Sequence, residues 1–345
     1  MKPIAWMAVL CLAGAVSCGK WPVSPAGVPF RVSLAENGTR AVLSGVTGGD
    51  GTERIDWVRG DRIRVASPQA VRSDGTTDRW ADYRISSVQA DGASSHGRVE
   101  PEGKALLSWG DGKHDFHAAC PPPADADAAL LQEGRFSGSV PTEQTLDWNG
   151  STGEPDPSLL LLLASARETE PETEVHLVFR PAFTALSFSL ELRDKHPVTI
   201  SRFRLESSEG PLAGPFSVTM NRDTGTCALT DAADIVIPEK DGASAVTIRM
   251  DRMLAEGAPL TFTALCLPRD LSGLKAVFET DYGTKSLVLS RKDGTPVIIP
   301  ACTKARITGL VLPGAPDITF SVDELVPWTE EADEKEATGP FNHQN

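Results

Sequence analysis

Apolar and polar residues alternate along most of this chain, which is the pattern of β-strands that bury one face. Five segments alternate most clearly, with apolar positions at Val28, Phe30, Val32 and Leu34; Leu186, Phe188, Leu190 and Leu192; Val246, Ile248 and Met250; Leu260, Phe262, Ala264 and Cys266; and Ile318, Phe320 and Val322, whose parity Val326 and Trp328 keep. Turn pairs such as Asp91-Gly92 and Asp241-Gly242 separate the runs. Many short strands with frequent turns predict an all-β chain built from sandwiches.

One segment departs from this alternation. Asp156-Pro157 is typical of a helix start, with Ser158 to Ala166 continuing the helix, but the five leucines at 159–163 fit a buried strand equally well. The next stretch, residues 167–174, is charged and contains a proline. It predicts a linker that divides the chain into two domains near residue 172.

The N-terminus predicts export. A basic start, Met1-Lys2, precedes an apolar run over 3–16, which is too short to cross a hydrocarbon layer of ~30 Å and reads as a secretory signal. The next residues, Ser17-Cys18-Gly19 after Val16, resemble the lipobox of bacterial lipoproteins, in which a peptidase cuts before the cysteine and its sulfur carries lipid. The alternative is an ordinary signal peptide that contains Cys18.

Charge and cysteine content narrow the classes of protein. The net charge is -14, which argues against nucleic-acid binding because such surfaces are basic. The acidic, polar segment 329–345 cannot bury enough apolar area to fold and is predicted to be disordered. Four cysteines remain beyond the lipobox and form either two disulfides, in three possible pairings, or isolated buried thiols: Cys120, Cys227, Cys266 and Cys302.

The sequence carries no motif for catalysis. It contains no G-x-S-x-G, H-E-x-x-H, P-loop or G-x-G-x-x-G pattern. His114 and His117 are three apart and face opposite sides of a strand, so they predict no metal site. Asp125 and Asp127 fall in an expected Ala-rich loop with too few oxygen donors for calcium. We therefore expect neither enzymatic activity nor a cofactor or metal.

A series of short motifs runs in order along the chain. They are Trp57 to Val65 (WVRGDRIRV), Phe116 with Ala118 to Pro121, Val140 to Thr145 (VPTEQT), Asp156 to Ala164, His176 to Phe188, and Val326-Pro327-Trp328. Together with the lipobox they resemble the fimbrillins, the subunits of type V pili of Bacteroidales. Arg180-Pro181 stands where that family has a histidine.

The resemblance implies two transthyretin-like β-sandwich domains, at 41–172 and 173–328. They follow a lipoprotein signal peptide at 1–17 and a propeptide with the first strand at 18–40. The resemblance also implies a pilus (fimbria) subunit that supports cell adhesion, lies at the surface of the outer membrane and uses an arginine-specific maturation protease. Its partners would be other pilus subunits, which assemble by donor-strand exchange.

The sequence offers a physical basis for that assembly. The polar loop 37–39 is suited to proteolysis, and Arg40 before Ala41 suits an arginine-specific protease. A cut there would remove the lipid and the first alternating strand, and would leave an apolar groove with unpaired edges. The predicted donor is the last alternating strand, with Ile318, Phe320, Val322, Val326 and Trp328.

Two other functions remain open. A carbohydrate-binding surface lipoprotein of a glycan-uptake system would need exposed aromatic side chains on one face. Trp80, Trp109 and Trp148, which have polar or turn-forming neighbours, are the candidates for that face. A secreted β-sandwich hydrolase would need a cleft with a carboxylate pair or a Ser-His pair.

Overall fold

The structure is a computed structural model, and it describes residues 27–34, 57–88, 93–192, 195–225, 227–290, 295–311 and 318–326. Four residues with predicted roles, Cys18, Arg40, Ala41 and Trp328, lie outside these ranges, as does the acidic segment 329–345. Within the described ranges, no helix is long and apolar enough to cross a membrane.

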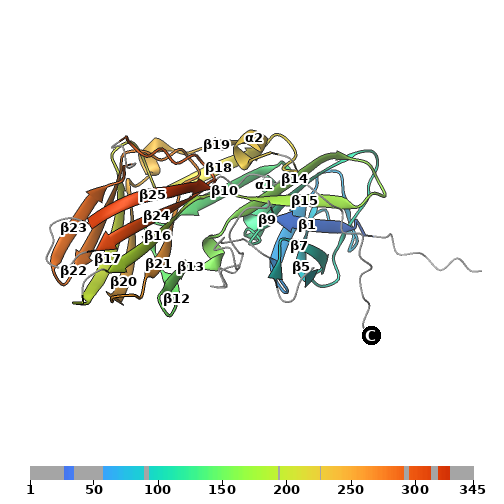
Figure 1. Cartoon of the computed structure of the whole chain (residues 1–345). Coiled ribbons are helices and arrows are strands. Elements are labelled where there is room, and N and C mark those ends of the chain that lie inside the picture. Colours follow the sequence, from blue (N-terminus) through green and yellow to red (C-terminus); the bar gives the residue numbers. More distant parts are fainter. Residues whose placement is uncertain are drawn as a thin grey trace, which may run out of the picture.

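One end of the molecule is a closed seven-stranded barrel (Figure 1). Its strands, in order around the barrel, are β1 (Phe30–Leu34), β15 (Val175–Pro181), β14 (Leu162–Thr169), β9 (His114–Cys120), β3 (Arg62–Ala66), β5 (Trp80–Val88) and β7 (His96–Pro101). Two short pairs accompany it, β2 (Trp57–Val58) with β6 (Ala93–Ser94) and β4 (Val71–Arg72) with β8 (Leu107–Ser108).

The other end of the molecule is formed by two sheets (Figure 1). The five-stranded sheet has the order β11 (Glu143–Gln144), β20 (Ala245–Leu254), β17 (Val198–Ser207), β22 (Leu274–Thr280) and β23 (Gly283–Val288). The six-stranded sheet has the order β12 (Leu146–Asn149), β13 (Thr152–Pro155), β21 (Leu260–Cys266), β16 (Thr184–Leu192), β24 (Lys304–Val311) and β25 (Ile318–Val326). Phe188 and Phe262 of one sheet pack against Phe203 of the other, at ring-centroid distances of 4.7 and 4.9 Å.

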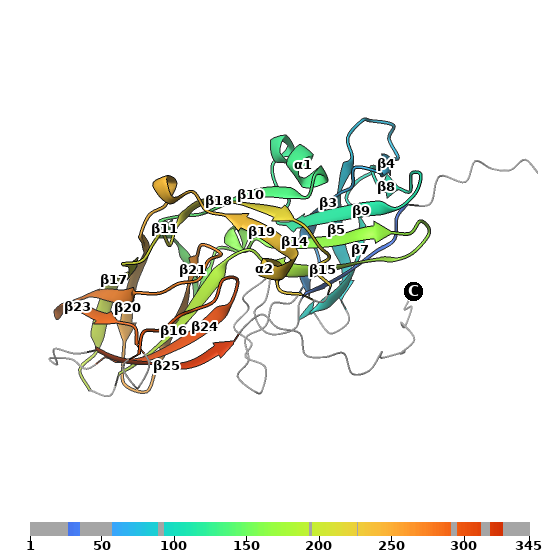
Figure 2. The same ribbon diagram turned by 90° about the horizontal axis from the view of Figure 1, so that it is seen from above.

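A three-stranded sheet lies between the two ends (Figure 2). It is formed by β10 (Arg135–Val140), β18 (Gly214–Met220) and β19 (Ala233–Val236). The helices are short, namely α1 (Asp125–Gln132), α2 (Leu229–Ala232), and the 3₁₀ turns η1 (Pro157–Leu159) and η2 (Glu239–Asp241). Asp125 and Asp127, which we expected in a loop, therefore begin helix α1, where two carboxylates favour the first turn.

The all-β prediction is confirmed. Burial alternates along β20, whereas most of the intervening positions of β16 and β21 are buried as well. The apolar positions predicted in β1, β16, β20 and β21 are all buried. The predicted sandwich at the N-terminal end is a closed barrel, because β1 bridges β15 and β7 and leaves the sheet without an edge there.

The segment that follows Asp156, for which the sequence allowed a helix or a strand, contains a short 3₁₀ helix followed by a strand. The Asp156 carboxylate accepts a hydrogen bond of 2.8 Å from the Ser158 N–H and caps η1, and strand β14 then takes the last leucines. The charged stretch that follows connects β14 to β15, and these strands pair directly at Leu162 with Pro181. Residue 172 thus falls between two neighbouring strands of the barrel, and the division into two domains stays a prediction.

A loop after β18 ties the central sheet to the barrel. Thr224 is fully buried, and its N–H donates to the Ser165 carbonyl at 3.0 Å while its hydroxyl donates to the Val178 carbonyl at 2.6 Å. The Ser165 N–H in turn donates to the Thr224 hydroxyl at 3.0 Å. Arg180, the residue that departs from the family pattern, is buried and donates to the Thr224 carbonyl at 3.2 Å. This loop therefore fills the space where β14 and β15 diverge.

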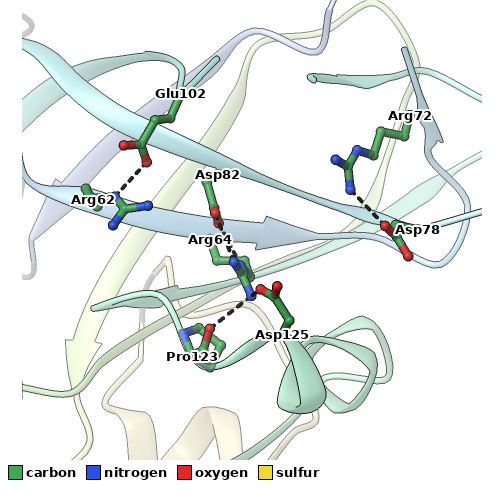
Figure 3. A network of polar contacts seen from close by, with 8 residues as sticks. All are labelled: Arg62, Arg64, Arg72, Asp78, Asp82, Glu102, Pro123 and Asp125. Atoms are coloured by element: carbon green, nitrogen blue, oxygen red, sulfur yellow. Dashed lines mark hydrogen bonds and ion pairs between the residues drawn. The ribbon is translucent and has the colours of Figure 1, made fainter. Parts of the chain in front are cut away.

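A buried arginine fixes helix α1 to the barrel (Figure 3). The Arg64 guanidinium on β3 makes a bidentate contact with Asp82 on β5, at 2.6 and 2.9 Å. It also contacts Asp125 at 2.8 Å and the Pro123 carbonyl at 2.9 Å. Burial disfavours the charge of Arg64, but the two carboxylates outweigh it and raise its pKa. The guanidinium also lies 3.9 Å from the Trp80 ring centroid.

Candidate site of strand exchange

Strand β1 has hydrogen-bonded neighbours on both sides. It runs parallel to β15, with Phe30 opposite Val175 and Leu34 opposite Phe179. It runs antiparallel to β7, with Val32 opposite Gly97. The space between β15 and β7 that holds β1 is called here the β1 socket. Because β1 alone joins these two strands, its removal would leave an unpaired edge on each side of the socket.

Side chains at alternate positions anchor β1 in the barrel core. The exposed fraction is 5% for Val28, 6% for Phe30, 0% for Val32 and 3% for Leu34. The Phe30 ring packs in a T-shaped arrangement against two aromatic rings, Tyr83 at 5.2 Å and Phe116 at 5.3 Å between centroids. Burying four such side chains contributes roughly 1.5–3 kcal/mol each.

Gly97 of β7 lies opposite Val32 and packs against it. A Cβ built on Gly97 would lie 3.4 Å from Val32 Cγ2, which is ordinary contact, and 3.3 Å from Ile85 Cγ2, which is slightly tight. The sequence did not predict Gly97, Tyr83 and Phe116 as socket residues. The alternation shows which face of a strand is buried, but it does not show which strands lie beside it.

The outward positions of β1 are polar. Arg31 lies 3.9 Å from the Glu174 carboxylate and is half exposed, so this ion pair contributes little. The Ser33 hydroxyl lies 2.8 Å from His176 Nε2. The register places Arg31 directly opposite Arg98 of β7, and like charges in such positions repel. The apolar face of β1, rather than its polar face, therefore holds it in place.

The predicted donor strand is β25, which forms the edge of the six-stranded sheet. It pairs antiparallel with β24, with Val311 opposite Ile318 and Lys304 opposite Val326. The register shifts between Ile307, which faces Val322, and Arg306, which faces Glu324, so that Asp323 is an extra, bulged residue. Among the described strands, β25 thus has one hydrogen-bonded neighbour, whereas β1 has two.

The first of the quoted motifs forms a tight turn in the barrel. Trp57 is fully buried, and its ring meets Phe179 at 5.1 Å. The Asp61 carboxylate accepts a 2.8 Å hydrogen bond from the Val58 N–H. Burial raises the pKa of Asp61, although this hydrogen bond acts to lower it. Gly60 between them has a φ of 101°, which favours glycine.

The VPTEQT motif fixes the six-stranded sheet. The Gln144 side chain is buried and pairs with the backbone of Leu265, donating to its carbonyl at 2.7 Å and accepting from its N–H at 3.0 Å. The Gln144 amide therefore satisfies both backbone hydrogen-bonding groups of Leu265, as a neighbouring strand would.

The described residues bear on metal binding and on the hydrolase alternative. Among them, no group of three or more His, Cys, Asp and Glu side chains could hold a metal ion. Ser165 Oγ does lie 3.2 Å from His117 Nδ1, but both side chains are buried, with exposed fractions of 2% and 4%. Burial lowers the pKa of His117 to about 4, so the ring is neutral at pH 7.

A shallow cavity of about 410 Å³ opens beside β19, with Ile235, Ile237, Pro268 and Asp270 among its lining. Asp270 is its one carboxylate, so it offers no carboxylate pair.

The four cysteines beyond the lipobox are free thiols. Cys266 and Cys302 are buried, and burial raises the pKa of each to about 12. Burial also raises the pKa of Cys120. Of the two alternatives left open by the sequence, isolated thiols are therefore the one found.

The three tryptophans considered for a carbohydrate platform are each partly buried and packed on the core. Trp80 lies beneath Arg64, Trp109 meets His114 at 5.0 Å, and Trp148 lies 4.7 Å from Arg252. Trp80 and Trp109 belong to the barrel region and Trp148 to β12 of the other end, so they do not form one face.

Known proteins resemble this chain in structure rather than in sequence. No family model and no curated protein matches it. A candidate cell adhesion protein from Bacteroides uniformis is 13% identical with a TM-score of 0.53, over 88% of this chain and 98% of its own. A candidate cell adhesion protein from Bacteroides ovatus is 17% identical with a TM-score of 0.53, over 89% of this chain and 99% of its own.

The tip fimbrial protein Mfa3 from Porphyromonas gingivalis, truncated at its C-terminus, also matches, with 10% identity and a TM-score of 0.43 over 88% of this chain and 100% of its own. Of these three structures, the two from Bacteroides show the shared fold, because their TM-scores are 0.53. The chain therefore has the fold of Bacteroides cell adhesion candidates, which confirms, at the level of fold, the resemblance to a fimbrillin-like family.

Proposed function

We propose that this chain is a structural subunit of a pilus, assembled by protease-triggered strand exchange and supporting cell adhesion. The observation that carries the proposal is the position of β1, a terminal strand that closes the barrel between β15 and β7 and buries four apolar side chains. Loss of such a strand leaves a preformed groove that another chain's strand can fill. The two Bacteroides structures of the same fold, described as candidates for cell adhesion, are consistent with this role.

Export and maturation complete the proposal. Cys18 carries lipid after removal of 1–17 and anchors the chain at the surface of the outer membrane. An arginine-specific protease cuts between Arg40 and Ala41, which detaches the lipid together with β1. Before the cut, β1 fills its own socket and keeps the subunit monomeric during export. After the cut, the socket receives a strand from another pilus subunit.

The donor in this proposal is β25, with Ile318, Phe320, Val322, Val326 and Trp328 as its apolar positions. Support comes from its place at a sheet edge, where it leaves by breaking one ladder of hydrogen bonds. No catalytic residue, cofactor or metal takes part, and the proposal assigns the chain no enzymatic activity.

The test is the size of the protein before and after cleavage. Full chain purified from membranes is treated with an arginine-specific protease, mass spectrometry identifies the new N-terminus, and sedimentation velocity gives the size. We expect the chain that begins at Ala41 to form oligomers, and the Arg40→Ala variant to stay monomeric under the same treatment. A chain that begins at Ala41, has released β1 and stays monomeric at high concentration would contradict the proposal.

A further inference from the structure

We infer that residues 327–331 of this chain (PWTEE) dock in the cavity beside β19, with Trp328 on its apolar floor and the two glutamates at Arg269 on its rim. This contact lies outside the proposed function and does not depend on strand exchange. In the uncut chain it holds the end of β25 at its own sheet edge.

The cavity lies between β19 and one end of the six-stranded sheet. Among the described strands, β19 is the edge of the central sheet, and the facing wall comes from the loop after β21 and the residues just before β24. The volume of about 410 Å³ has room for one indole ring. Its apolar floor is formed by Pro211, Ala233, Ile235, Ile237, Pro268 and Ala301.

Strand β25 leads toward this cavity. It ends at Val326, opposite Lys304, which follows the cavity residue Ala301 by three positions. Because the two strands are antiparallel, continuing their register brings Trp328 alongside the residues just before Lys304, and Thr329 beside Ala301. The proline after Val326 favours this path, since it holds the residue before it extended. Trp328 is therefore within reach of the cavity without a turn of the chain.

The chemistry of the cavity suits a tryptophan. A buried indole needs apolar walls for its ring and one acceptor for its N–H. Asp270 supplies that acceptor at the rim: its Oδ1 accepts a 2.8 Å hydrogen bond from the Ala301 N–H, and Oδ2 can accept another. Four aromatic residues lie outside the described ranges, namely Trp6, Trp21, Trp328 and Phe341. Of these, Trp328 is nearest along the chain to a described strand.

Arg269 adds charge complementarity at the rim. Its guanidinium donates to two backbone carbonyls, at 3.3 and 3.5 Å, and within the described part of the chain no carboxylate forms an ion pair with it. Glu330 and Glu331 follow Trp328 by two and three residues, so they bring carboxylates to this rim when the ring is seated. An exposed ion pair contributes little. The ring therefore supplies most of the binding, and the charges orient the segment.

The occupant is the chain's own segment rather than that of a second copy. A site and a ligand joined by a short connection meet at an effective concentration in the millimolar range. In dilute solution this tethered segment outcompetes the same segment of another molecule.

The test is fluorine NMR of the full, uncut chain labelled with fluorotryptophan. Trp328→Phe identifies the Trp328 resonance, and a peptide of residues 322–334 gives its undocked position. Ile235→Asp places a charge in the cavity floor. Val236→Asp is the matched control, because Val236 is 59% exposed and does not line the cavity. Thermal unfolding checks that each variant folds, and sedimentation velocity checks that it is monomeric.

We expect the wild-type Trp328 resonance to lie away from the peptide's position. Ile235→Asp should lower the ratio of docked to undocked signal by about tenfold or more, because it buries a charge, while Val236→Asp leaves the ratio unchanged. A wild-type resonance at the peptide's position, or an equal response to both substitutions, would overturn the docking. A docked fraction that rises with protein concentration would overturn the assignment to the chain's own segment.

A charge exchange tests the contact with Arg269. Arg269→Glu alone, and Glu330→Arg with Glu331→Arg, should each lower the docked ratio by about threefold, and the combination should restore it. The control combines Arg269→Glu with Asp333→Arg and Glu334→Arg, and should not restore it. Restoration by neither combination, or by both, would overturn this contact. All these measurements precede cleavage, so their failure leaves strand exchange standing, whereas a cut chain that stays monomeric rejects strand exchange and leaves this docking intact.

Discussion

Truncating the central anchor of β1 should loosen the socket without unfolding the rest of the chain. Phe30 is 94% buried (6% exposed) and its ring contacts Tyr83 and Phe116. Replacing a buried phenylalanine by alanine costs about 3–5 kcal/mol, as lost burial plus the cavity that remains. Since about 1.4 kcal/mol corresponds to a factor of ten, Phe30→Ala should raise the population with β1 detached between about a hundredfold and about four-thousandfold.

Hydrogen exchange of the backbone amides in β7 and β15 reads this population, because these amides open when β1 leaves. The matched control is Arg31→Ala at the next position, where the side chain is half exposed and its ion pair contributes roughly 0–1 kcal/mol. The reasoning predicts faster exchange in β7 and β15, with β17 and β22 at the far end unchanged. A less than fivefold effect in β7 and β15, or an equal effect in all four strands, would refute it.

Three further substitutions test the rest of the fold. Gln144→Leu leaves two buried backbone groups of Leu265 without their partner and should lower the free energy of unfolding by roughly 2–5 kcal/mol, with the exposed Glu143→Leu as control in denaturant titrations. Thr224→Val breaks the bonds that tie its loop to the barrel and should cost about 1–3 kcal/mol in thermal unfolding. His117 has a lowered pKa of about 4, so stability is full above pH 6.5 and falls by roughly 3 kcal/mol as the pH drops to 4; His117→Asn should abolish this part of the pH dependence.

Local pattern was sufficient to find strands but not their neighbours. Val28, Phe30, Val32 and Leu34 are buried as their alternation predicted, because one face of any half-buried strand must point inward. That β1 pairs parallel with β15, more than 140 residues away, depends on tertiary packing that no local window contains. Closure of the barrel was missed for the same reason.

The charged stretch around residue 172 is a case that composition leaves open. Polar residues with a proline suit an exposed connection, and the structure has such a connection between β14 and β15. Composition alone does not distinguish a hairpin loop from a linker between domains, because both are solvated. Arg180 shows the reverse case: a charged residue is buried here, where the Thr224 carbonyl accepts its hydrogen bond.

The most direct test of the account is the N-terminus of the subunits inside native fibres. Fibres shed from cells are purified, dissociated and analysed by mass spectrometry of intact chains and of their N-terminal peptides. The account predicts chains that begin at Ala41 and contain no peptide from residues 27–34. Fibres whose subunits of this chain retain β1, with Cys18 or any other residue before Val28 at their N-terminus, would contradict it.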